Sequence, residues 1–283
     1  MEAGALAIIA GGGSLPVEVA EAVAAGGRAV RMVGIVGAAG PEIERFDHIW
    51  MKFGEIGRLF RQLEAWGCRD LVLAGAVTRP HPSEIKLDFG ALASLPDLAR
   101  LLHGGDDGVL GGVVRFLETR GYRLVSVPEV APGLTMAGAG IEIGRPDEDA
   151  RAAIVHGMAV LAALAPHDVG QALVVVGGRA VAIEGLEGTD AMLERVAGLR
   201  ASGRLRGPPR SGVLVKGPKR GQDLRVDLPT VGPRTLDKAT EAGLVGLALA
   251  RSEVLIVERD RVRASAGRGG LFVVGVDWGG VGR

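Results

Sequence analysis

The sequence predicts an α/β protein with an N-terminal Rossmann-like, doubly wound parallel sheet and a second α/β domain with a mixed sheet, joined by a linker. The chain has 283 residues, enough for two domains of roughly 100–200 residues each. In its first half, short apolar runs alternate with helical patterns, and many of the 46 glycines stand where one gives way to the other. In its second half, a glycine pair separates two apolar runs, which indicates antiparallel pairing.

The first 130 residues repeat a strand–helix unit. Leu6–Ala10 is predicted as a buried strand, followed by a glycine turn and a helix that begins near Pro16 and ends at Gly26. Further strands are predicted at residues 29–36, 71–75 and 122–127, and further helices at 55–65 and 107–120. Strands separated by helices pair in parallel, so a doubly wound sheet is expected.

Residues 131–145 are rich in Pro, Gly and Ala, which predicts a linker between a domain at 1–130 and a domain at 146–283. In the second domain, Gly177 and Gly178 separate strands at 172–176 and 179–183 and predict a hairpin. The other predicted elements are helices at 147–165, 191–199 and 233–242 and strands at 212–216, 254–257 and 271–276.

Composition excludes several classes of protein. Lys plus Arg and Asp plus Glu both number 33, so no overall charge draws the chain to nucleic acid, and any anion site is local. Cys68 is the only cysteine, which excludes an internal disulfide. The first residues lack a basic segment, and no run reaches the ~18 uninterrupted apolar residues of a membrane helix. A cytoplasmic location is expected.

A glycine turn follows the first predicted strand. The backbone N–H groups of Gly11, Gly12 and Gly13 stand where a strand meets a helix, a place that suits a phosphate. The alternative is that these glycines only permit a tight turn. A dinucleotide fingerprint is not complete, because its third glycine would fall at Pro16.

Two further positions in the first domain invite a ligand. Arg79 follows the strand predicted at 71–75, and ligands bind at the carboxyl ends of parallel strands. Asp107 precedes a helix, where it either caps the helix or faces a cleft between the domains. A surface arginine and a helix cap are the structural alternatives.

Acidic residues gather between the predicted hairpin and the next helix, at Glu184, Glu187 and Asp190, together with Thr189. Helix capping explains one such residue but not three. Carboxylates near a phosphate require a cation between them, and hard oxygen ligands suit Mg²⁺.

The densest motif runs over residues 216–230. If residues 223–228 are extended, Asp223, Arg225 and Asp227 project from one face of a strand. Residues 200–225 hold eight Lys or Arg against one acid, which suits a pyrophosphate. A solvated ladder of ion pairs is the alternative.

Taken together, these motifs resemble the UDP-2,3-diacylglucosamine pyrophosphatases of the LpxI type. The resemblance rests on the glycine turn at 9–16, the loop at 75–80, and the motifs at 105–107, 187–190 and 216–229. It extends over nearly the whole chain and implies Mg²⁺-dependent hydrolysis of UDP-2,3-diacylglucosamine to UMP and 2,3-diacylglucosamine 1-phosphate (lipid X) in lipid A biosynthesis. It also implies that the substrate is held between two domains and that Asp227 is the essential aspartate.

On this resemblance, Asp227 is a metal ligand or general base, and Asp190 and Glu187 are metal ligands or orient water, with Asp227 and Asp190 as the metal pair. Lys216, Lys219 and Arg225 are expected to hold phosphate groups. The full set expected to contact the substrate is Gly11, Gly12, Gly13, Arg79, Asp107, Thr189, Lys216, Lys219, Gln222, Asp223, Arg225 and Thr230.

Other interpretations stay open. The first strand–helix–strand unit also suits a nicotinamide-dependent oxidoreductase, and an apolar cleft would suit a non-catalytic carrier of lipid or nucleotide. An acylated substrate implies transient contact with the cytoplasmic face of the inner membrane. The sequence does not decide the oligomeric state, and a homodimer is one expectation.

Overall fold

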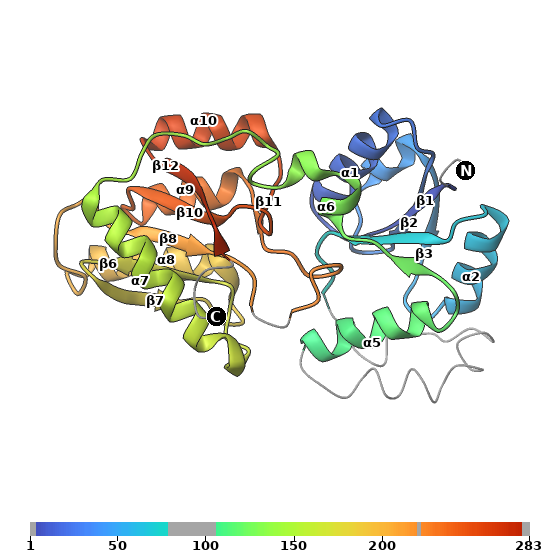
Figure 1. The fold of residues 1–283 in the computed structure, drawn as a ribbon, viewed down its shortest axis with the longest axis horizontal. Coiled ribbons are helices and arrows are strands. Elements are labelled where there is room, and N and C mark those ends of the chain that lie inside the picture. The colour runs from blue at the N-terminus through green and yellow to red at the C-terminus, as the bar shows by residue number, and fades with distance from the viewer. Residues whose placement is uncertain (1–3, 79–105, 220–221, 279–283) are drawn as a thin grey trace. The chain divides into compact units, whose positions relative to one another are not determined.

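The structure is a computed structural model that describes residues 4–78, 106–219 and 222–278. The chain divides into two compact units (Figure 1). Unit 1 comprises Met1–Pro132 and Asp223–Asp227, and unit 2 comprises Gly133–Gln222 and Leu228–Arg283. Unit 1 therefore contains a short stretch of chain taken from between two elements of unit 2. The α/β fold class expected from the sequence is confirmed in both units.

Unit 1 is built on a five-stranded sheet in which every pairing is parallel, in the order β3-β2-β1-β4-β5. The strands are β1 (Leu6–Ala10), β2 (Val30–Ile35), β3 (Asp47–Met51), β4 (Asp70–Ala74) and β5 (Arg123–Leu124). The strand order reverses between β1 and β4, so the carboxyl ends of these two strands form the switch point at which open α/β sheets bind ligands.

Helices cover both faces of this sheet. They are α1 (Leu15–Ala25), α2 (Ile56–Ala65), α5 (Asp106–Glu118) and the short α6 (Val127–Val130), with 3-10 turns at Pro41–Arg45 and Pro132–Leu134. Helix α1 packs on β1, β2 and β4 and contacts α6, whereas α2 and α5 share a core with the opposite face (Figure 1). Successive side chains of each strand point to opposite faces of the sheet, so each strand contributes buried side chains to the cores on both faces.

The amino edge of the unit 1 sheet carries an ion cluster. Asp70, the first residue of β4, is bound by Arg28 Nη2 at 2.6 Å and by two nitrogens of Arg123, each at 2.8 Å. These hydrogen bonds, from Arg123 first, lower the pKa of the 15% exposed Asp70 carboxyl to about 2. The cluster ties the starts of β4 and β5 to the turn before β2.

Unit 2 contains a mixed five-stranded sheet in the order β12-β10-β8-β6-β7. Its strands are β6 (Ala172–Val176), β7 (Arg179–Ile183), β8 (Val213–Lys216), β10 (Gly246–Ala250) and β12 (Phe272–Val276). Strands β8, β10 and β12 are parallel, and β6 is antiparallel to β8 and to β7. The hairpin expected around Gly177 and Gly178 is present, and both glycines have positive φ angles.

Helices also cover both faces of the unit 2 sheet: α7 (Glu148–Leu164, continued by a 3-10 turn at Ala165–His167), α8 (Gly188–Ala201), α9 (Pro233–Glu241) and α10 (Arg259–Gly269). Helix α7 shares one core with the sheet, and α8, α9 and α10 share the other (Figure 1). A separate parallel pair joins β9 (Thr230–Val231) to β11 (Leu255–Ile256).

The segment expected to be a linker, residues 131–145, packs largely into unit 2. Met136, Ala139 and Ile141 are buried in its core, and Ile143 pairs with Val273. The chain first passes from unit 1 to unit 2 at Pro132 and Gly133, and it enters and leaves unit 1 again at Asp223 and Asp227.

Helix α7 is apolar enough for the stretch Glu148–His167 to match a membrane span in length and composition, the one such stretch among the described residues. Its inner face, including Ile154, Met158 and Leu161, packs against the unit 2 sheet. A core helix satisfies the same criterion, so this match is weak evidence for a membrane span.

Candidate functional site

Some of the charged and polar residues singled out in the second half of the chain, Glu184, Thr189, Asp190 and Lys216 among them, lie at one edge of the unit 2 sheet. The parallel strands β8, β10 and β12 end at this edge. Because β6 runs antiparallel to β8 and β7 antiparallel to β6, the start of β6 and the end of β7 lie there too. Helix α8 begins just after β7. Carboxyl ends of parallel strands are the usual place for a ligand in such sheets.

Lys216 is the last residue of β8, and its side chain lies on a face that is otherwise apolar. It stands opposite Ala172 on β6 and Leu249 on β10, and it shares a face with Leu214 two residues before it. All three of these neighbours belong to the core that α8 and α9 cover. Lys216 is only 5% exposed, so an ammonium group is buried close to the start of α8.

A chain of hydrogen bonds receives this ammonium. Lys216 Nζ donates to the Thr189 hydroxyl at 2.7 Å, and Thr189 in turn donates to Glu184 Oε1 at 2.8 Å. The other oxygen of Glu184 accepts the backbone N–H of Gln171 at 3.0 Å. The buried cation is thereby linked to a carboxylate, as a charge in a protein interior requires.

The loop after β8 is fixed by several contacts. Lys219 Nζ pairs with Asp168, and the Lys219 backbone N–H donates to the side chain of Gln222 at 3.0 Å. Trp278 Nε1 donates to the carbonyl of Pro218 at 3.2 Å, and a Cβ on Gly217 would lie 2.4 Å from the Trp278 ring. Lys216, at the end of β8, and Lys219, in the segment that follows, are therefore both held by side-chain contacts, and their role in phosphate binding stays a prediction.

The first turn of α8 carries two acidic residues. Asp190 accepts hydrogen bonds from Thr235 Oγ1 at 3.0 Å and forms an ion pair with Arg234 at 3.1 Å. Glu187 pairs with Arg195 at 2.8 Å, and backbone N–H groups together with that guanidinium lower the pKa of Glu187. Glu187 occupies the capping position, although its side chain makes no capping hydrogen bond, so Thr189 and Asp190 are not the helix cap.

In unit 1, the glycine turn lies at the switch point between β1 and β4. Gly11 N–H donates to Ala74 O at 2.8 Å and Gly12 N–H donates to Ala76 O at 2.7 Å. A Cβ on Gly11 would lie 2.5 Å from Ala76 O, so glycine is needed for two loops to approach. The N–H groups of Gly11 and Gly12 are thus engaged with protein carbonyls, whereas Gly13 enters α1 with a positive φ angle.

The prediction that residues 223–228 form an extended strand is wrong. Residues 224–226 form a turn, in which the N–H groups of Val226 and Asp227 both donate to the carbonyl of Asp223, at 3.1 and 3.2 Å. Asp223, Arg225 and Asp227 therefore do not share a strand face. The same alternation of polar and apolar residues is compatible with a turn, because an apolar residue of the turn, here Val226, packs on the core of unit 1.

Arg225 is held by acidic partners within unit 1. It donates two hydrogen bonds to Asp223, at 2.9 and 2.7 Å, and one to Glu118 in the last turn of α5 at 2.6 Å. The hydrogen bond from Arg225 lowers the pKa of Asp223. The end of α5 precedes β5 and so lies toward the amino edge of the sheet, whereas the glycine turn lies at its carboxyl edge.

The remaining predicted site residues are placed as follows. Arg79 and the side chain of Asp107 lie outside the described residues, and Thr230 in β9 donates to the carbonyl of Leu228 at 3.2 Å. Asp190 belongs to unit 2 and Asp227 to unit 1. Within the described part of the chain, no three His, Cys, Asp or Glu residues gather as a metal site.

Part of the basic excess at residues 200–225 serves the fold. Arg200 donates to the carbonyls of Ala242 and Pro208, and Arg210 donates to those of Gly269 and Gly270. These arginines hold loops together through hydrogen bonds to backbone carbonyls. The number of basic residues in a segment does not distinguish this role from phosphate binding. Sequence analysis placed Glu184 in an acidic cluster but did not connect it to Lys216, which breaks the apolar pattern of β8 and is linked to Glu184 through Thr189.

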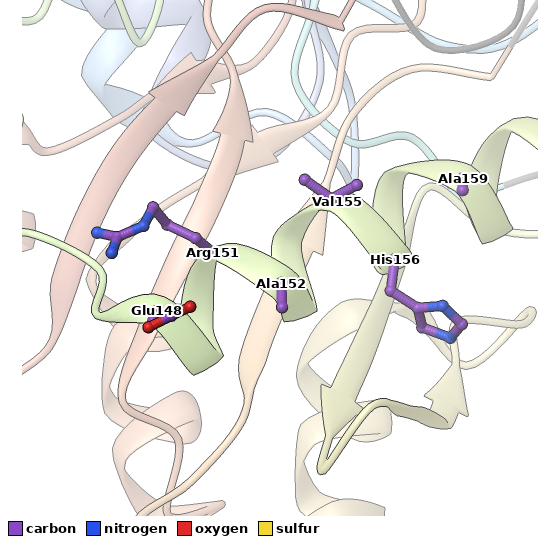
Figure 2. A pocket seen from close by; sticks show the side chains of 6 residues that line it. All are labelled: Glu148, Arg151, Ala152, Val155, His156 and Ala159. Atoms are coloured by element: carbon purple, nitrogen blue, oxygen red, sulfur yellow. The ribbon is translucent and has the colours of Figure 1, made fainter.

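Two surface hollows lie away from this edge. One, of about 620 Å³, follows the outer side of α7, and Figure 2 shows its six lining residues on that single helix, among them Arg151, Val155 and His156. The other, of about 520 Å³, lies by the β6–β7 turn and is lined in part by Arg179 and Arg204. A surface formed by one helix lacks the converging polar groups of a binding site.

Comparison with known proteins places both halves of the chain. Residues 5–134 match the LpxI N-terminal domain and residues 139–274 match the LpxI C-terminal domain. The chain belongs to the LpxI family. It is similar to the UDP-2,3-diacylglucosamine pyrophosphatase LpxI of Caulobacter vibrioides, with 39% identity over 272 residues, which is 96% of this chain and 97% of that protein. LpxI sequences of both domains are thus matched in order, as the motifs predicted.

Proposed function

We propose that this chain hydrolyses the pyrophosphate bond of UDP-2,3-diacylglucosamine to UMP and 2,3-diacylglucosamine 1-phosphate, a step of lipid A biosynthesis. The observation that carries the proposal is the 39% identity to a pyrophosphatase of that name over almost the full length of both chains. Neither the nicotinamide oxidoreductase nor the carrier receives comparable support. The ordered cationic edge of unit 2 suits a phosphorylated substrate.

The chemistry asked of the residues is the hydrolysis of a phosphoric anhydride. The oxygen of water bonds to one phosphorus, the P–O–P linkage breaks, and the water proton passes to a base, so each product keeps one phosphate. Lys216 and Lys219 are suited to hold phosphate oxygens, because positioned cations offset the charge that develops in the transition state. Arg225 would have to exchange Asp223 or Glu118 for a phosphate in order to serve in the same way.

Asp227 is assigned as the general base or a metal ligand, and Asp190 and Glu187 as ligands or water-orienting groups. In the described structure Asp190 is bound by Thr235 and Arg234, and Glu187 by Arg195. For Asp190 and Glu187 to bind a metal or orient water, these partners must either hold the two carboxylates in the required position or release them. The remaining contact residues, including Gln222 and Thr230, stay assigned to the substrate.

A divalent cation, Mg²⁺, is part of the proposal. Carboxylate oxygens suit this ion, and Mg²⁺ is usually bound through one or two carboxylates, with substrate phosphates and water completing the shell. The absence of a three-residue metal cluster among the described residues is compatible with such a site. Asp190 and Asp227 are the candidate ligands, and the ion would supply positive charge to the phosphate oxygens.

The substrate also suggests where the enzyme works. A diacylated glucosamine nucleotide carries its head group in water and its acyl chains in lipid, so we infer a cytoplasmic enzyme that makes transient contact with the membrane surface. A homodimer is compatible with this assignment. Flotation with vesicles that contain the substrate, and sedimentation of the purified chain, test these two expectations.

The direct test is to incubate the purified chain with UDP-2,3-diacylglucosamine and Mg²⁺ and to follow UMP and lipid X by mass spectrometry. The proposal predicts equal amounts of both products and their loss after chelation, with activity restored by added Mg²⁺. Recovery of intact substrate would favour a carrier and overturn the proposal. Full activity after exhaustive chelation would overturn the metal assignment alone.

A further inference from the structure

We propose that Glu184 is a positioning residue of the unit 2 edge, which acts through the Thr189 hydroxyl to hold the Lys216 ammonium in place for the phosphate groups of the substrate. This inference rests on the proposed function, because it takes Lys216 to be a phosphate-binding cation. Its basis is the set of hydrogen bonds that joins the ends of β7 and β8 to the first turn of α8.

The hydrogen bonds have only one possible direction. An ammonium group has donors and no acceptor, so Lys216 donates to Thr189 Oγ1. The single hydrogen of that hydroxyl is then directed to Glu184 Oε1 at 2.8 Å. Thr189, which the sequence assigned to substrate contact, therefore links Lys216 to Glu184 instead of donating to a phosphate.

Both carboxylate oxygens of Glu184, its backbone N–H and its carbonyl all form hydrogen bonds. Its Oε2 accepts the N–H of Gln171 at 3.0 Å, and its own N–H donates to the carbonyl of Ala172 at 2.9 Å. Its carbonyl accepts the N–H of Gly170 at 3.2 Å, where a Cβ on Gly170 would lie 2.4 Å from that oxygen. The carboxylate thus has a defined position relative to β6, from which it orients Thr189.

Lys216 places a positive charge where an apolar side chain would also fit. The side chain is buried, and it meets the start of α8, which is the positive end of the helix dipole. An apolar residue would extend the pattern of Val213, Leu214 and Val215 without burying a charge. Packing does not explain a lysine at this position, whereas delivery of a positive charge to an anion does.

The test is a double-mutant cycle of Glu184→Gln and Lys216→Met, measured as kcat/KM for UMP release. Glu184→Gln alone is expected to lower kcat/KM roughly 10- to 100-fold, the range found for partners that orient metal ligands. In the Lys216→Met background the same change is expected to cost less than about twofold, because the group that it positions has gone. An equal cost in both backgrounds would reduce Glu184 to a structural residue and overturn the inference.

A second pair of variants isolates the hydroxyl. Thr189→Val keeps the shape of the side chain and removes the link, so it should lower kcat/KM as Glu184→Gln does and should also lose its effect in the Lys216→Met background. Thr189→Ser keeps the hydroxyl and should restore kcat/KM to near the parent value. If Glu184→Gln does not fold, this pair decides the inference, and a Thr189→Ser variant as inactive as Thr189→Val would contradict it.

Titration with inorganic pyrophosphate separates this inference from the proposed function. Calorimetry on the parent and the three cycle proteins should show weaker binding in each single variant and no further loss in the double variant. This readout applies even if the parent does not release UMP, an outcome that would refute the proposed function alone. Parent affinity no higher than that of Lys216→Met would overturn the inference, whatever the outcome of the activity assay.

Discussion

In the part of the chain that the structure describes, the two units each carry a charge cluster, and the two clusters lie at opposite kinds of sheet edge. In unit 1 the cluster of Asp70, Arg28 and Arg123 lies at the amino edge, and the carboxyl edge is closed by backbone hydrogen bonds between two glycine-rich loops. In unit 2 the linked side chains of Lys216, Thr189 and Glu184 lie at the carboxyl edge.

The difference separates charges that stabilise a fold from charges that serve a ligand. Three short hydrogen bonds from arginines hold the pKa of Asp70 at about 2, so this carboxylate is more stable in the folded chain than in water. Lys216 is also linked to an opposite charge, through Thr189 to Glu184, but it lies at the carboxyl edge of its sheet, where ligands of such sheets bind. We propose that this charge serves the substrate.

The largest effect is expected at Asp227, in the short segment that unit 1 takes from the second half of the chain. Asp227→Ala removes a carboxylate from a half-buried turn and leaves Val226 packed on the core. Loss of a general base costs ~10²–10⁴-fold in rate, and loss of a metal ligand would add to this. Turnover should nearly vanish, while substrate affinity should stay near that of the parent because the lysines remain.

Circular dichroism provides the folding control for Asp227→Ala. A matched variant is Asp237→Ala, which should keep full activity, because Asp237 is an exposed carboxylate on α9 that pairs with Arg268 of α10. A folded Asp227→Ala protein that releases UMP within about tenfold of the parent would lie outside the range of a catalytic base. Asp227 would then be a turn residue without a catalytic role.

The glycine turn at the carboxyl edge of unit 1 should be sensitive to added side-chain volume. Gly11→Ala would set a Cβ 2.5 Å from Ala76 O and 2.8 Å from Gly75 O, and such overpacking costs up to about 3 kcal/mol. Urea unfolding followed by circular dichroism measures this loss. Gly111→Ala in α5, whose Cβ would meet only Arg115 at 3.7 Å, should be neutral or stabilising; an equal loss in both variants would contradict the role given to the turn.

The amino edge of unit 1 should respond to pH. The pKa of Asp70 is lower in the folded chain than in the unfolded chain, so its stabilisation is complete above about pH 4 and is lost as the pH falls toward about 2. The shift corresponds to about 2 kcal/mol of stability at neutral pH. Asp70→Asn should remove this amount at pH 7 and much less at pH 2.5, and a difference that is independent of pH would refute it.

Much of the fold was predictable because it follows local rules. Strands β1, β6 and β7 have the predicted limits, since apolar runs bounded by glycine turns mark them. Strand β3 was missed because it begins with Asp47 and His48 and is only partly buried. Strand β10 was missed because its Ala and Leu residues favour helices, and α10 because its sequence is polar and rich in glycine.

The site was less predictable because its contacts join distant segments. The sequence picked out Lys216, Thr189 and Asp190, but it could not show that Thr189 points to Glu184 and Asp190 to Thr235. The alternation of polar and apolar residues at 223–228 predicted a strand where the chain forms a turn. The hydrogen bonds to the carbonyl of Asp223 that form this turn cannot be recognised in the residue pattern. The lysine that ends the apolar run of β8 could have indicated a buried charge, but the sequence analysis did not draw this conclusion.

The most direct test of the account measures stability and turnover together in Lys216→Met and Asp70→Asn. Lys216→Met should strongly lower kcat/KM for UMP release, because the charge proposed to hold phosphate is removed, and it should also lower the free energy of unfolding, because the Glu184 carboxylate loses the cation linked to it through Thr189. Asp70→Asn should lower the free energy of unfolding by about 2 kcal/mol and leave kcat/KM at the parent value. A loss of turnover in Asp70→Asn as large as the loss in Lys216→Met would contradict the separation of structural and functional charge.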